Sequence, residues 1–199
     1  MISDALTTAS VEPWMLGLLF ALVLADSFLV VVPGEIAVTA LGALSVTDGR
    51  PVLWAVVVIA AAAAFTGDAA CYLVGRRVGL ERWGWMRRPR TVAAFGWATR
   101  RLHRSTASIL FTARFIPFAR IAVNLTAGAS RVGAPRYLAV SAGAATAWAL
   151  YQSLIGAAVA TLLPGAPVLA VVVSIALALT LGVIVDVLLA RRFGAAPPT

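Results

Sequence analysis

The feature that most constrains this chain is a series of apolar runs, each long enough to cross a lipid bilayer. A helix needs about 20 residues to cross the hydrocarbon core, and such runs follow one another through the 199-residue sequence. Charged residues make up 12% of the chain, whereas a soluble domain carries about a quarter. The sequence therefore predicts an all-α integral membrane protein without a separate soluble domain.

We expect a single membrane domain over residues 14–190, with a polar or interfacial lead-in at 1–13 and a tail at 191–199. Two expected segments are re-entrant, meaning that the chain enters the bilayer and returns to the same side. The expected segments are a re-entrant hairpin at 14–48, a span at 51–75, a basic loop at 76–104, a re-entrant hairpin at 105–130, and spans at 137–163 and 168–190. They form two inverted hairpin-plus-span units and a further C-terminal helix, a plan that recurs in transporters. In an alternative arrangement, residues 14–32 cross the bilayer completely and the N-terminus is cytoplasmic.

Both re-entrant hairpins are predicted from helix breaks inside apolar sequence. Pro33 and Gly34 interrupt the first hairpin, and Pro117 interrupts the second, where Gly128 is expected to serve the same break. Proline lacks a backbone donor and glycine is conformationally permissive, so both residue types interrupt a helix. Irregular backbone at membrane depth is tolerated only where protein buries it or where it lines a wet cavity.

The distribution of arginine predicts the orientation of the chain. All sixteen basic residues are arginine, and nine of them lie in 76–104, which has Glu81 as its one acid. Cytoplasmic loops are enriched in basic residues, so we expect this loop and the C-terminus to be cytoplasmic. The placement of the charge between apolar runs makes nucleic acid a poorer partner than anionic lipid head groups.

Four ionisable residues fall at or near the two breaks: Asp26, Glu35, Arg114 and Arg120. Each costs roughly 2.5–3.5 kcal/mol at the centre of a membrane helix on insertion scales, so we expect the two acids to face the two arginines. The planar fork of arginine suits phosphate or carboxylate oxygens. The pattern predicts a site for an anionic head group, and the apolar surroundings indicate that the rest of the substrate is a lipid.

Other polar residues are less informative. Asp68 either forms part of the same site or simply reaches Arg76 or the membrane interface. The lone His103 cannot build a metal site, and we expect neither a metal nor a cofactor. The enzyme motifs that contain histidine pairs or a nucleophilic serine are missing from the apolar segments, so we expect a protein that is not an enzyme.

Three segments carry distinctive motifs: D-S-F-L-V-V-V-P-G-E at 26–35, G-D-A-A-C-Y-L-V-G-R-R-V-G at 67–79, and R-F-I-P-F-A-R at 114–120, the last followed by Ala-Gly at 127–128. Together these segments resemble the DedA family. The resemblance covers most of the chain from residue 14 to about 165. It implies two re-entrant hairpins that face each other, in agreement with the hydropathy.

The resemblance also implies the function. Asp26 and Glu35 would be the essential membrane acids of the family and Arg114 and Arg120 its essential arginines, although Asp26 stands where glutamate is usual. Bacterial members are linked to proton-dependent lipid transport in the plasma (inner) membrane. Their substrates are undecaprenyl phosphate, which is recycled as a lipid carrier, and phospholipids such as phosphatidylethanolamine.

The predicted mechanism is an exchange of ionic partners. A lipid phosphate would take the arginines, and the acids would then favour proton uptake because they have lost their counter-charge in a low dielectric. The expected partners are therefore an anionic lipid and protons, with a homo-oligomer possible. The alternatives are a membrane scaffold that transports nothing and a transporter of a small anionic solute.

Overall fold

The computed structural model describes residues 2–29, 34–80, 84–104, 109–110, 113–114 and 117–163, together with scattered positions from 169 to 180. Within these ranges, the side chains of 2–12, 85, 94, 101, 103–104 and 117–118 are not described. The expected helix break at Pro33, most of 105–116, and nearly all of the expected span at 168–190 and the tail lie outside the described residues.

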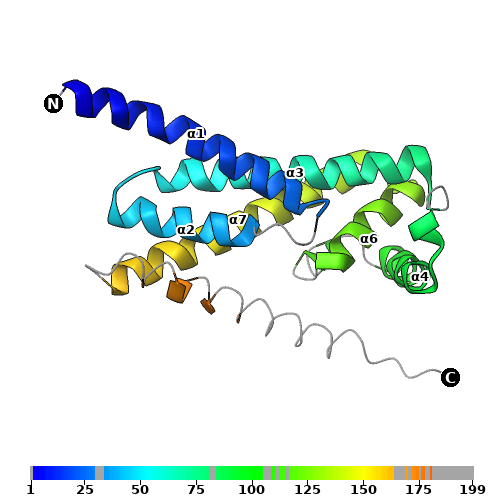
Figure 1. Cartoon of the computed structure of the whole chain (residues 1–199). Helices are drawn as coiled ribbons and strands as arrows, with labels where there is room; N and C mark the ends of the chain where they lie inside the picture. The colour runs from blue at the N-terminus through cyan, green and yellow to red at the C-terminus, as the bar shows by residue number, and fades with distance from the viewer. Residues whose placement is uncertain are drawn as a thin grey trace. The chain divides into compact units, whose positions relative to one another are not determined.

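The elements of the described part are helices, which confirms the all-α prediction. In chain order they are α1 (Ile2–Asp26), α2 (Gly34–Thr47), α3 (Leu53–Val78), the 3₁₀ helix η1 (Gly84–Arg87), α4 (Pro89–Arg104), α6 (Pro117–Ala129) and α7 (Ala134–Leu162) (Figure 1). Two of them, α3 and α7, are long and apolar enough to cross a membrane. They coincide with the predicted spans 51–75 and 137–163.

Two segments that the sequence predicts to be a lead-in and a loop contain helices. The lead-in expected at 1–13 is continuous with α1, which begins at Ile2. The expected basic loop contains η1 and all of α4. An amphipathic helix is possible there because apolar residues recur at helical spacing between the arginines.

The chain divides into two compact units. Unit 1 consists of Met1–Thr66 and Ala145–Ala178, and unit 2 of Gly67–Ala144 and Leu179–Thr199. The long helices α3 and α7 each contribute one half to each unit. Unit 1 thus takes the first half of α3 and the second half of α7, whereas unit 2 takes the opposite halves.

Unit 1 is a bundle around an apolar core. Helices α1 and α2 pack against each other (Figure 1), and α3 and α7 add further apolar side chains, many of them alanine. The buried core residues of this unit include Leu19, Val23, Val38, Val56, Ala60, Ala63, Ala64, Trp148 and Ala149. Alanines on α3 permit the close helix packing that membrane bundles use in place of a hydrophobic driving force.

In unit 1, α2 and α7 cross at a pair of glycines that allow the two backbones to approach closely. A Cβ at Gly42 would overlap the carbonyl oxygen of Ser153, and a Cβ at Gly156 would overlap that of Thr39. Each glycine therefore contacts the carbonyl three residues before the other glycine. Thr39 and Gln152 are hydrogen-bonded beside this crossing, with 3.2 Å between Oγ1 and Oε1.

In unit 2, α3 and α6 cross with the same reciprocal contacts between glycines and backbone carbonyls. A Cβ at Gly75 would overlap the carbonyl oxygen of Leu125, and a Cβ at Gly128 would overlap that of Tyr72. Leu125 again stands three residues before one glycine and Tyr72 three before the other. Gly128 was expected at a helix break, but it lies inside α6, where close packing against α3 requires it.

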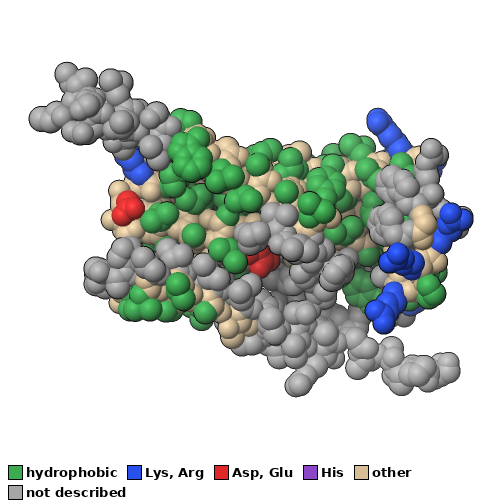
Figure 2. All heavy atoms as spheres, in the orientation of Figure 1, with side chains coloured by type: hydrophobic (Ala, Val, Ile, Leu, Met, Phe, Trp, Pro, Cys, Tyr) green, Lys and Arg blue, Asp and Glu red, His purple; other side chains and the backbone are tan. Residues whose placement is uncertain are grey.

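The outer faces of the two long helices are apolar. On α3, Trp54 is 70% exposed and Val58 follows one turn later; on α7, Leu150 and Leu154 are exposed and Leu162 is 77% exposed. Hydrophobic side chains extend along α3 in Figure 2. Exposed apolar stripes of this length are unfavourable in water but suit contact with lipid chains.

Candidate functional site

The most elaborate polar cluster in the described part surrounds Asp68, on the half of α3 that belongs to unit 2. Asp68 is 3% exposed. Its Oδ2 accepts from Nη1 of Arg114 at 2.5 Å and from Oγ of Ser141 at 3.2 Å, and its Oδ1 accepts from Nδ2 of Asn124 at 2.8 Å. The Tyr137 hydroxyl donates to the backbone carbonyl of Asp68 at 2.9 Å. The carboxylate is therefore bound by three chain segments at once.

These contacts account for how a charge is held in an apolar bundle. A buried charge is tolerated where it is paired and its remaining lone pairs are hydrogen-bonded. Both oxygens of Asp68 accept bonds, and the arginine supplies a full counter-charge. Apolar residues of similar volume would serve stability as well or better, so stability alone does not explain why the pair is present.

A pair of stacked tyrosines adjoins the cluster. The rings of Tyr72 and Tyr137 stack with centroids 4.2 Å apart. The Tyr72 hydroxyl donates to the carbonyl of Val132 and accepts from Nη1 of Arg76 at 2.6 Å. Because Tyr72 lies one turn after Asp68, the stacked tyrosines link α3 to the start of α7 next to the cluster.

The two predicted arginines lie around the beginning of α6. Arg114 precedes Pro117, the first residue of α6, by three positions, and Arg120 is the fourth residue of that helix. Both side chains are buried, Arg120 at 8% exposed. The first turn contains no acidic residue, and helix N-termini carry unpaired N–H groups and a partial positive charge. This end of α6 therefore concentrates positive charge inside the protein.

The two predicted acids lie around the beginning of α2, in unit 1. Asp26 ends α1, and Glu35 is in the first turn of α2; both are half-buried. A Cβ at Gly34 would lie 2.9 Å from the Cβ and 3.2 Å from the Cγ of Asp26. Glycine at the first position of α2 thus lets the Asp26 carboxyl approach the N-terminus, where a negative charge is favourable.

The sequence predicts that Asp26 and Glu35 face Arg114 and Arg120. The structure places the acids in unit 1 and the arginines in unit 2, so that pairing stays a prediction. Of the two alternatives for Asp68, the structure shows contact with Arg114. Arg76 contacts Tyr72 instead.

Sequence reasoning missed the contribution of α7 to this cluster. Tyr137 and Ser141 stand one turn apart on an otherwise apolar helix, and both contact Asp68. That spacing is the signal that could have identified them, because residues four apart share one face of a helix. For Asn124, the sequence favours a cavity-lining position and an interhelical hydrogen bond equally; in the structure its Nδ2 donates to Asp68.

Comparisons with known proteins give one match. A family model described as the VTT domain matches residues 32–158, well over half of the chain. The match contains Glu35, Asp68, Arg114 and Arg120, and it begins after Asp26. No curated protein and no solved structure matches the chain.

Proposed function

We propose that this chain, which belongs to the VTT-domain family of DedA and SNARE-associated membrane proteins, transports a lipid with an anionic phosphate head group. The substrate would be undecaprenyl phosphate or a phospholipid such as phosphatidylethanolamine. The membrane would be the bacterial plasma membrane, with the basic segment 76–104 and the C-terminus cytoplasmic. The two candidate spans and their apolar outer faces support placement in a bilayer.

One observation carries the proposal: two buried arginines flank the acid-free N-terminus of α6. Guanidinium groups bind phosphate oxygens in pairs, and helix N-termini add backbone N–H donors aimed at the same anion. Arg114 is compensated by Asp68, so an entering phosphate competes with a carboxylate that already occupies one edge of the guanidinium. The site is thereby stable when empty and able to exchange its anion.

Exchange at Arg114 offers a route to proton coupling. When a phosphate takes Arg114, Asp68 keeps Asn124 and Ser141 as donors but loses its counter-charge in an apolar bundle. Proton uptake by Asp26 and Glu35, at the N-terminus of α2, would offset the negative charge that the phosphate brings. Lipid binding and proton uptake would then promote each other, as linkage requires.

The two units support a repeated architecture for this transporter. In each unit, the helix that begins at a predicted break (α2 or α6) crosses a long helix at two reciprocal glycines. We infer that the units are inverted repeats and that each interrupted segment forms a re-entrant hairpin. In transporters of this plan, the substrate site lies near the midplane at broken helices.

The test is lipid flipping in proteoliposomes that contain the full chain. A labelled polyprenyl phosphate and a labelled phosphatidylethanolamine are compared with and without a pH gradient. We expect movement of one lipid to depend on the gradient and to fall at least tenfold in Arg120→Gln and Glu35→Gln. Arg136→Gln is the matched control because Arg136 is exposed at the start of α7, and it should keep full activity.

The rival functions correspond to other outcomes of the same assay. If neither lipid moves but a small anion such as inorganic phosphate crosses the membrane, the chain is a solute transporter. If nothing moves and the charge-neutral variants behave like the unsubstituted protein, a scaffold is favoured. Chemical modification of the labelled lipid would contradict the proposal that the protein is not an enzyme.

A further inference from the structure

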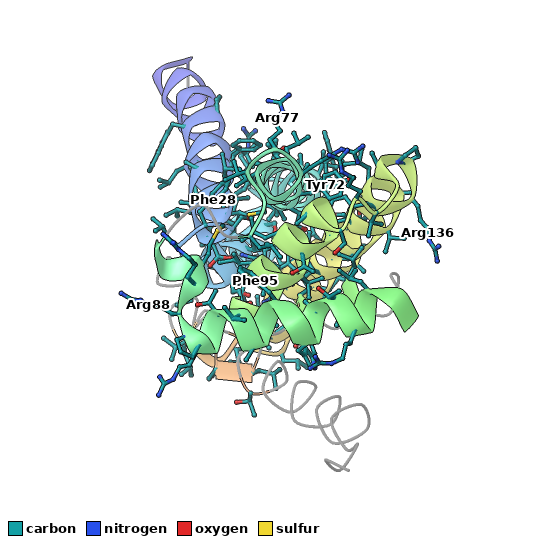
Figure 3. All side chains as sticks on the ribbon, turned by 90° about the vertical axis from the view of Figure 1, so that its right-hand side faces the viewer. Phe28, Tyr72, Arg77, Arg88, Phe95 and Arg136 are labelled. Atoms are coloured by element: carbon teal, nitrogen blue, oxygen red, sulfur yellow. The ribbon has the colours of Figure 1, made fainter. Side chains whose placement is uncertain are left out.

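A second group of arginines lies on the surface of unit 2 and takes no part in the buried cluster. Arg76 and Arg77 end α3, Arg87 and Arg88 lie at η1, and Arg90 and Arg100 lie on α4; all six side chains are exposed. We call these six residues the arginine surface. Figure 2 shows the basic side chains gathered over η1, α4 and the end of α3. Arg77 and Arg88 point away from the ribbon in Figure 3.

Helix α4 has two opposite faces. Phe95, Ala98 and Leu102 are buried and belong to the clusters through which α4 packs against η1 and α6. Arg90 and Arg100 are on the exposed side. Because the apolar face is fixed in the core of unit 2, the outer face is presented by a packed helix and not by a loose loop.

The position of the arginine surface follows from α3. Arg76 and Arg77 are in the last turn of a helix long and apolar enough to cross a membrane, so they lie where such a helix reaches the lipid head groups. Helix α4 begins eleven residues after α3 ends. Half-buried Trp97 on α4 is a residue type that suits the interfacial layer, and Val92 on the same helix is an exposed apolar side chain, 54% accessible.

The charge of this surface is unbalanced over the part of 76–104 that the structure describes. The described residues of that segment contain no aspartate or glutamate, and over the whole of 76–104 nine arginines stand against one acid, Glu81. Arginines near a membrane surface attract anionic lipids, and the guanidinium fork matches a phosphodiester.

We propose that the arginine surface binds anionic phospholipid head groups of the leaflet it faces and holds α4 at the membrane surface. This binding is separate from the proposed transport site, because Arg114 and Arg120 are buried whereas the arginine surface is exposed. The occupant is the head group of a resident lipid such as phosphatidylglycerol, which is not itself moved across the membrane.

The experiment measures which lipid lies next to α4. The full chain carries Cys71→Ala, which removes its one cysteine, and Ala93→Cys, at an exposed position of α4, labelled with bimane. It is reconstituted in phosphatidylcholine vesicles that contain equal amounts of brominated phosphatidylglycerol or brominated phosphatidylcholine. We expect stronger quenching by the anionic lipid and a preference that weakens as salt is added.

Removal of the arginines should remove this preference. In Arg87→Gln/Arg88→Gln/Arg90→Gln, the relative affinity for phosphatidylglycerol should fall about fivefold for each arginine. The control is Arg131→Gln/Arg136→Gln, which removes an exposed arginine between α6 and α7 and another at the start of α7, and should leave quenching at position 93 unchanged. Arg76 is left in place because it contacts Tyr72.

Three results would overturn the proposal. Equal quenching by brominated phosphatidylglycerol and phosphatidylcholine, in the protein that keeps all six arginines, would show that the arginine surface does not prefer anionic lipid. A preference that survives the triple substitution would assign the lipid to other residues, and an equal loss in the control pair would reduce the effect to overall charge. Restoration by Arg87→Lys/Arg88→Lys/Arg90→Lys would support the proposal, since charge is what attracts the lipid.

Discussion

Helices α2 and α6 invite comparison because each begins at a helix break predicted from the sequence and each crosses a long helix at reciprocal glycines. Gly42 of α2 lies against a backbone carbonyl of α7, and Gly128 of α6 lies in the same way against a backbone carbonyl of α3. The beginnings of the two helices differ in charge. The start of α2 has acids, Asp26 beside it and Glu35 in its first turn, whereas α6 begins between two arginines.

The polar contacts near the two crossings differ as well. The α2–α7 crossing has a neutral hydrogen bond between Thr39 and Gln152, whereas the part of unit 2 that contains the α3–α6 crossing has a buried ion pair between Asp68 and Arg114. The first crossing shows that the backbone geometry can be built without an ion pair. We infer that the glycines serve the fold and that the charges serve the function.

The largest expected effect follows from removing the buried arginine. In Arg114→Ala, Asp68 would be left as a buried charge without this counter-charge, which typically costs about 3–5 kcal/mol. Thermal unfolding in detergent, with size-exclusion chromatography as the readout of folded protein, should show a markedly lower unfolding temperature. Arg136→Ala serves as the exposed control, and an equally stable Arg114→Ala protein would contradict the assigned pairing.

Replacing glycine by alanine at either helix crossing should lower the stability of the protein by a similar amount. Gly75→Ala and Gly128→Ala in unit 2, and Gly42→Ala in unit 1, force a methyl group against a backbone carbonyl, and overpacking costs about 1–3 kcal/mol. The same unfolding assay measures the loss. Gly17→Ala on α1 is the control, since nothing lies within 4 Å of its Cβ position. If only one crossing were sensitive, the equivalence of the two units would be wrong.

The neutral pair in unit 1 should matter less than the ion pair. Gln152→Leu removes one hydrogen bond, worth about 0.5–1.5 kcal/mol, and Thr39 still donates to the carbonyl of Glu35 at 2.9 Å. We expect lipid flipping to continue at nearly the unsubstituted rate once protein amounts are matched. Loss of flipping here would show that function is not confined to the charged groups.

The smallest expected effect on stability is at the start of α2. Asp26→Asn and Glu35→Gln remove favourable charges near a helix N-terminus, each worth about 0.3–1 kcal/mol. Their expected effect on function is larger: the flipping rate should no longer respond to a pH gradient. Rates compared across external pH test this expectation. An unchanged pH response in both variants would remove these acids from the proton pathway.

The sequence was sufficient to predict the two spans and the class of the fold, because hydropathy depends on composition along a helix. It also identified Arg114 as a buried charge, because a charged residue inside an apolar run is conspicuous. It could not identify Asp68 as the residue that contacts Arg114, since that contact joins positions 46 residues apart. Ser141 and Tyr137 were missed because hydroxyl groups are common in membrane helices and become informative only when the facing helix is known.

The central claim is that the buried pair serves function and not the fold, and Asp68→Asn/Arg114→Gln tests it most directly. The double variant replaces both charges with amides that can hydrogen-bond to each other, so stability should recover toward the unsubstituted value relative to Arg114→Ala. The folded double variant, measured in proteoliposomes, should not flip the lipid probe. A double variant that is stable and flips lipid at the normal rate would contradict the account.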